Sequence, residues 1–109
     1  MRTLRFIVDG QIISPDPSCN FDGLIPGTVG YVQAEFSFSK DWKDCAKVVA
    51  FWSPFGREYP PQVLEDDRRC YIPSEALAKQ SFKIQVIGQR DDFKLVTNKL
   101  LIKQNGGRS

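Results

Sequence analysis

Residues 68–89, RRCYIPSEALAKQSFKIQVIGQ, place a short helix-forming segment between two segments with strand character. The first segment ends at Pro73, whose ring fixes φ and removes a backbone donor. Residues 74–79 favour a helix. From Phe82 to Ile87, mainly alternating apolar and polar residues are typical of a half-buried strand. We therefore expect a strand, one or two helical turns near residues 74–80, and a second strand.

Such a helix suits a chain that must cross from one sheet of a β-sandwich to the other over the open end of the core. Pro73 occupies a position where its missing N–H is harmless, and Ser74 is predicted to cap the first turn. Ala76, Leu77 and Ala78 are predicted to form the inward, apolar face of the helix. We expect this helix to cover the core and to hold no active site.

Strand-like alternation extends through the rest of the chain. Asp9-Gly10 lies between alternating apolar segments and predicts a hairpin with a type I′ turn. The alternation returns over residues 28–39, 45–52 and 93–103, with proline- and glycine-rich loops breaking the pattern. About seven or eight short strands with this punctuation indicate an all-β fold, an antiparallel β-sandwich.

Length and composition are those of one globular domain. The chain has 109 residues, 41% of them hydrophobic, which is enough for a single core. We assign residues 1–104 to the β-sandwich and residues 105–109 to a flexible polar tail. Fifteen basic and thirteen acidic residues are spread along the chain, which argues against a nucleic-acid partner. No apolar run is long enough to cross a bilayer and no export signal is visible, so we predict no membrane partner.

Few residues are suited to catalysis. Histidine, the commonest general base and metal ligand, is absent. The widely spaced cysteines, Cys19, Cys45 and Cys70, form no metal-binding pattern. The carboxylate pairs at residues 66–67 and 91–92 are typical of solvated turns. We therefore expect no enzyme activity, no metal and no cofactor.

Aromatic residues gather around an irregular, proline-bearing segment. Tryptophan, tyrosine and arginine dominate the energetics of protein interfaces. The candidate protein-contact surface consists of Trp42, Trp52, Phe55, Arg57 and Tyr59. Filling the core is the alternative and more frequent role for the two tryptophans. Phe55 and Tyr59 lie among prolines in a loop, so we expect both to be partly exposed.

Four segments, FSFSKDWKDCAKVVAFW, CYIPSEAL, FKIQVIGQ and KLVTNKLLIKQ, resemble small β-sandwich modules of bacteriophage tail and baseplate proteins. The resemblance includes the amino-terminal modules of upper baseplate proteins from phages of Gram-positive bacteria. The matching residues, within residues 31–103, are Phe36, Trp42, Phe51, Ile72, Pro73, Glu75, Gly88, Thr97 and Asn98. It implies a phage or prophage origin, a location in the virion or the host bacterial cytoplasm, and assembly through protein contacts, often with cyclic symmetry.

Three functions remain open at this point. The first is a non-enzymatic structural protein that contacts virion proteins, or other copies of itself, in a tail, baseplate or head-fibre assembly. The second is a small phage-encoded inhibitor that binds a host defence protein. The third is a carbohydrate-binding sandwich with Trp42 or Trp52 as the stacking platform. The final strand carries Lys94, Lys99 and Lys103, charges that guard a sheet edge where a partner could still add a strand.

Overall fold

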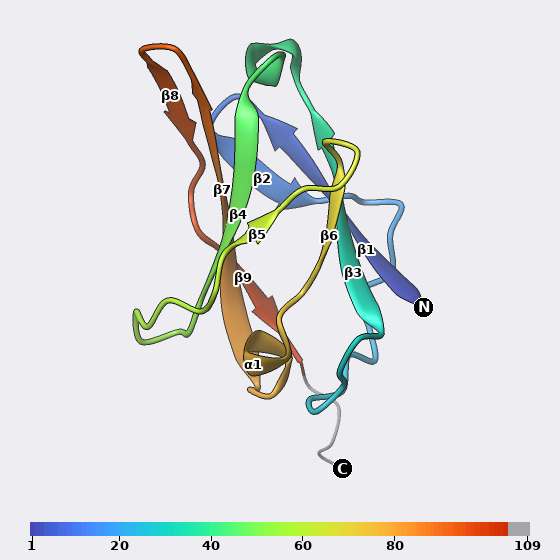
Figure 1. Ribbon diagram of the computed structural model, residues 1–109. Coiled ribbons are helices and arrows are strands. Elements are labelled where there is room, and N and C mark those ends of the chain that lie inside the picture. The colour runs from blue at the N-terminus through green and yellow to red at the C-terminus, as the bar shows by residue number, and fades with distance from the viewer. Residues whose placement is uncertain (105–109) are drawn as a thin grey trace.

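The computed structural model describes residues 1–104, which form two β-sheets packed against each other (Figure 1). The first sheet has the strand order β2 (Ile12–Pro15), β1 (Arg2–Asp9), β3 (Val32–Phe38) and β6 (Arg69–Tyr71). The second has the order β5 (Gln62–Val63), β4 (Ala46–Trp52), β7 (Ser81–Arg90) and β8 (Phe93–Val96), with β9 (Leu100–Lys103) also paired to β7. The predicted all-β sandwich is confirmed. The tail predicted at residues 105–109 lies outside the described residues.

The amino-terminal hairpin forms as expected, although its turn differs in detail. β1 and β2 are antiparallel, with Asp9 opposite Ile12, so Gly10 and Gln11 are the two loop residues. Gly10 has a φ of 58°, whereas Gln11 is not among the residues with positive φ. The predicted type I′ turn at Asp9-Gly10 is therefore wrong, because that turn needs positive φ at both central residues.

One strand pairing departs from the antiparallel pattern. β1 and β3 run parallel, with Leu4 beside Ala34 and Phe6 beside Phe36. A long loop over residues 16–31 connects β2 to β3. This loop brings the start of β3 beside the start of β1, where Val32 pairs with Arg2. Local alternation fixes which face of β3 is buried, but it does not determine the strand's direction.

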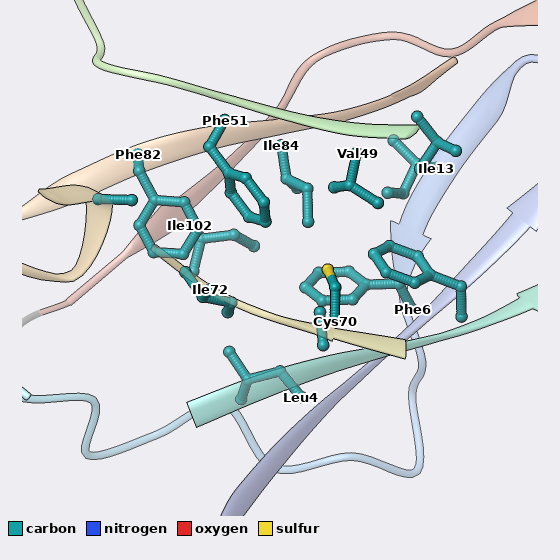
Figure 2. Packing of buried hydrophobic residues seen from close by; sticks show 14 of the residues in the cluster. Leu4, Phe6, Ile13, Val49, Phe51, Cys70, Ile72, Phe82, Ile84 and Ile102 are labelled. Atoms are coloured by element: carbon teal, nitrogen blue, oxygen red, sulfur yellow. The ribbon is translucent and has the colours of Figure 1, made fainter. Parts of the chain in front are cut away.

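The core lies between the two sheets, as Figure 2 shows. Its buried cluster comprises Leu4, Phe6, Val8, Ile13, Leu24, Val32, Ala34, Phe36, Trp42, Val49, Phe51, Tyr59, Cys70, Ile72, Ala76, Leu77, Phe82, Ile84, Val86 and Ile102. Within it, the ring of Phe6 stacks on Phe36 and meets the edge of Phe21, each at a centroid separation of 5.4 Å. Removal of this apolar surface from water is the main force that holds the sheets together.

The short helix connects the two sheets as predicted, and it ends at Leu77, before the expected end near residue 80. α1 (Ser74–Leu77) joins β6 in the first sheet to β7 in the second (Figure 1). Ala76 and Leu77 are buried and close the core. The predicted cap is wrong: Pro73 is the N-cap residue, and no side chain there accepts a hydrogen bond from the first turn. Ala78, predicted to face inward, is exposed.

The single final strand predicted at residues 93–103 is also wrong. The structure breaks it into β8 and β9 at residues 97–99, and both parts pair with β7. Thr97 Oγ1 accepts a hydrogen bond from the Val86 backbone N–H at 3.0 Å. Asn98 Oδ1 accepts another from the N–H of Ile13, in the other sheet, at 2.9 Å. The break therefore links the edges of the two sheets.

Candidate functional site

The five predicted contact residues have very different environments. The Trp42 side chain is fully buried (0% exposed) and Tyr59 is 7% exposed, so the exposure expected for Tyr59 is wrong. Trp52 is partly buried. Arg57 is exposed, and Phe55 is 96% exposed. Trp52 lies at the end of β4, and Phe55, Arg57 and Tyr59 lie in the loop that follows it, so these four residues are close in the chain. Trp42 lies in a different connection, between β3 and β4.

Trp42 is buried because its turn folds back over the end of the sandwich. The residue ends a 3₁₀-helix, η1 (Lys40–Trp42), between β3 and β4. Its indole Nε1 donates a hydrogen bond to the Gly10 carbonyl at 2.8 Å, which satisfies the one polar atom of the side chain. The ring lies so close to Gly88 that an added Cβ would stand 2.7 Å from it. Trp42 is therefore a core residue and takes no part in a contact surface.

Trp52 ends β4 on the outer face of the second sheet. Lys99 Nζ stands 3.8 Å from the centroid of its ring, a cation–π contact that occupies one aromatic face. The indole Nε1 is buried and has no hydrogen-bond partner among the described residues. The ring therefore has no freely exposed platform on that side.

The loop after β4 is a closed turn organised by one serine. Ser53 Oγ accepts hydrogen bonds from the backbone N–H groups of Phe55 and Arg57, at 3.2 and 3.0 Å. The Ser53 N–H donates to the Arg57 carbonyl at 2.7 Å, and the Gly56 N–H donates to the Ser53 carbonyl at 3.1 Å. Gly56 has a φ of 96°, a conformation that glycine adopts without a steric penalty. The sequence S-P-F-G-R thus fixes the backbone around Phe55.

The same loop is anchored to the core at its second end. The Tyr59 N–H donates to the Phe51 carbonyl at 2.8 Å, and the Tyr59 side chain belongs to the buried cluster. A single exposed hydrophobic residue is ordinary on a protein surface. Phe55 differs because its backbone is held by hydrogen bonds on both sides and its ring has almost no contact with the chain's own core.

Two grooves flank this loop. The first, here called the loop groove, has a volume of about 440 Å³ and is lined by Ser53, Pro54, Phe55, Tyr59, Lys79, Gln80 and Ser81. The second, here called the helix groove, has a volume of about 460 Å³ and is lined by Arg57, Glu58, Tyr59, Pro60, Glu75, Ala78 and Lys79. Tyr59 and Lys79 line both grooves, so the grooves adjoin. Together with Phe55 they form the candidate site.

A second surface was missed by the sequence reasoning. The outer face of the second sheet carries an apolar row across four strands, with Val48 opposite both Val63 and Ile87, and Ile87 opposite Val96. Val63 is 76% exposed. The apolar residues on both sides of β4 correctly predicted a central strand. They could also have indicated this row, since no further layer among the described residues covers it.

The polar residues have structural environments. Asp66 and Asp67 adopt positive φ in the turn between β5 and β6, where Asp67 pairs with Lys47 at 2.7 Å. Burial raises the pKa of the Cys70 thiol to about 12, so the thiol is neutral near pH 7 and poorly nucleophilic. Within residues 1–104, no group of three or more cysteine, aspartate and glutamate side chains is arranged to hold a metal ion.

None of the helices in the described part of the chain has the length and apolar character needed to span a membrane. Comparisons of the chain with protein families, with curated proteins and with solved structures gave no significant match.

Proposed function

We propose that this chain is a non-enzymatic assembly module of the phage tail and baseplate type, which binds a protein partner through Phe55 and the two adjoining grooves. The observation that carries the proposal is the almost fully exposed ring of Phe55, on a backbone held by hydrogen bonds, beside an apolar groove. A loop whose backbone is already held in place loses little backbone entropy on binding. A few anchor residues contribute most of the affinity of a protein interface, and phenylalanine is among the aromatic residues enriched there.

A protein partner fits these features better than a carbohydrate. The expected stacking platforms for a sugar were the two tryptophans, yet Trp42 is buried and one face of Trp52 is occupied by Lys99. Phe55 projects as a knob, which suits insertion into a pocket on another protein. The charges beside it are mixed, with Arg57 next to Glu58, which gives no phosphate-binding stripe.

The phage context of the proposal rests on the sequence resemblance. A virion component would lie in the virion, or in the host bacterial cytoplasm during assembly. Its partners would be virion proteins or further copies of the chain. Residues Phe36, Trp42 and Gly88 of the resembling pattern lie in the sandwich itself, so this resemblance concerns the scaffold. The contact role concerns the loop.

The proposal is tested by photo-crosslinking in a lysate of the cells in which the protein is naturally made. Benzoylphenylalanine replaces Phe55 in one sample and Phe93, a 39% exposed phenylalanine on β8, in the control. We expect position 55 alone to yield a discrete crosslinked species, which mass spectrometry identifies as a virion protein or this chain. A host defence protein would instead support the inhibitor function. Equal or absent crosslinking at both positions would overturn the contact role of Phe55.

A further inference from the structure

The candidate site places a projecting ring and a groove side by side at one end of the molecule. In Figure 1 the connection between β4 and β5 extends away from both sheets near α1. Phe55 lies in this connection, and residues 79–81 line the same loop groove. We propose that the chain forms a two-fold symmetric dimer in which Phe55 of each copy enters the loop groove of the other. This inference rests on the proposed function and names its partner.

Symmetry favours such an exchange. A two-fold interface uses the same patch on both subunits, so the patch must be complementary to itself. A surface that has only a projecting side chain, or only a groove, is not complementary to itself. Here Phe55 itself lines the loop groove. A two-fold axis between two copies therefore places the Phe55 ring of each copy at the loop groove of the other.

The groove has suitable size and chemistry for a phenyl ring. A cavity of roughly 150 Å³ is known to accommodate benzene, and the loop groove measures about 440 Å³. Pro54 and Tyr59 provide apolar wall, and the methylene groups of Lys79 extend it. The Lys79 ammonium can in addition lie over the face of the incoming ring, a favourable cation–π contact.

The charges around the site are balanced, which permits two copies to meet. Arg57 and Lys79 are basic and Glu58 and Glu75 are acidic, and all line the helix groove. A two-fold arrangement can therefore place opposite charges together. The outer face and edge of the second sheet are less suitable for contact between two copies. Like charges would repel there, because that region carries Lys83, Lys94, Lys99 and Lys103.

The dimer is tested by sedimentation equilibrium on the full chain over a concentration range of about 1 μM to about 500 μM. We expect a monomer–dimer equilibrium with a dissociation constant in about the micromolar range, because the contact involves one end of a small domain. Phe55→Ala should raise that constant at least about tenfold. The control variant Phe93→Ala carries the same chemical change at another position, and it should change the dissociation constant less than about threefold. Circular dichroism melts would verify that both variants fold.

A mixed-isotope crosslink then locates the contact. The chain carrying benzoylphenylalanine at position 55 is mixed as ¹⁵N-labelled and unlabelled protein and irradiated. We expect crosslinks between copies that join position 55 to the peptide containing Gln80 and Ser81. A monomer at every concentration, an unchanged constant for Phe55→Ala, or crosslinks at another surface would each overturn the dimer. If the chain is monomeric yet position 55 crosslinks to another identified virion protein, the proposed function survives without the dimer.

Discussion

Gly88 and Trp42 show how single residues set the packing at one end of the sandwich. Gly88 occupies a core-facing position of β7, and a Cβ built on it would lie 2.7 and 2.8 Å from two carbon atoms of the Trp42 ring. Contacts that short force a buried ring or a strand to move. We expect Gly88→Ala to lower the free energy of unfolding by about 1–3 kcal/mol, the usual cost of overpacking a core. Urea denaturation measures this change.

A double-mutant cycle isolates the cause. Trp42→Phe makes the ring smaller and opens space above Gly88, although it also removes the indole hydrogen bond to the Gly10 carbonyl. We expect Gly88→Ala to be less destabilising in the Trp42→Phe background than in the natural sequence, with a coupling of about 0.5–2 kcal/mol. Additive losses would mean that the clash with Trp42 is not the source of the effect.

The buried thiol of Cys70 leads to a prediction of how the free energy of unfolding depends on pH. Burial raises its pKa from 9.0 to about 12, since the apolar core disfavours the thiolate. The contribution of the neutral thiol is fully present below pH 9 and is lost as the pH rises toward 12, because the unfolded chain then binds fewer protons than the folded one. Cys70→Ala should remove a slope of up to about 1.4 kcal/mol per pH unit.

The measurement is urea denaturation of both proteins at several pH values from about 8 to about 12, which covers the interval from 9.0 to about 12 over which the shifted thiol loses its contribution. Cys19→Ala, at a partly exposed thiol, is the matched control and should keep the natural slope. If Cys70→Ala loses stability with pH as steeply as the natural chain, the buried thiol does not account for the alkaline loss.

At the scale of elements, the break between β8 and β9 shifts the register by one residue. Ile87 pairs with Val96, so an unbroken strand would place Lys99 opposite Ile84, but Leu100 stands there instead. Leu95 and Thr97 face the core before the break, and Leu100 and Ile102 after it. Because side chains alternate, this single extra residue turns Lys99 away from the core.

The break also marks what the sequence could not predict. Apolar and polar residues alternate well enough over residues 93–103 to indicate one strand. The cause of the interruption is long-range, since the Asn98 side chain bonds to a backbone group 85 positions away in the chain. Local patterning predicted most of the strand positions and the position of the helix. It did not predict the parallel β1–β3 pair, which likewise depends on distant partners.

The candidate site was predictable to a similar degree. Prolines and glycine around Phe55 indicated an exposed loop, and that part of the expectation agrees with the structure. Tyr59 belongs to the same loop but reaches the core, because its backbone is bonded to Phe51. Trp42 stands in a polar segment, yet Gly10 and Gly88 supply the acceptor and the space that bury it. Neither partner is adjacent in sequence.

Thr97 gives the prediction at this scale. Its side chain is buried and accepts the Val86 N–H at the point where the β-ladder is interrupted. Thr97→Val keeps the shape but leaves that buried N–H unpaired, which should lower the free energy of unfolding by about 1–3 kcal/mol. Thr97→Ser keeps the hydroxyl and should cost about 1 kcal/mol for the lost methyl group. Equal losses for both variants in urea denaturation would contradict the hydrogen-bond role.

For the whole molecule, three links close the sandwich in addition to the shared core. Asn98 joins the second sheet to β2, and Trp42 joins the connection between the sheets to the Gly10 turn. On the opposite edge, Lys47 projects inward from β4 and bonds to Asp67 in the connection between β5 and β6. The two sheets are therefore tied at both edges, and the loop end with Phe55 takes no part in these links.

The Lys47–Asp67 link provides the last prediction, because its two charges are unequally buried. The Lys47 side chain is 2% exposed and the Asp67 side chain 66%. Asp67→Asn tolerates the same positive φ but leaves the lysine buried without its counter-ion, so we expect a loss of about 1–2 kcal/mol, reduced from the cost of a fully buried pair by solvent screening. Lys47→Met removes the buried charge and should change stability by less than about 1 kcal/mol.

The neighbouring Asp66→Asn, also at positive φ, is the matched control and should cost less than about 0.5 kcal/mol. Thermal and urea denaturation rank the variants. If Lys47→Met proves the most destabilising, the ion pair itself, rather than the avoidance of an unpaired charge, holds this edge of the sandwich closed.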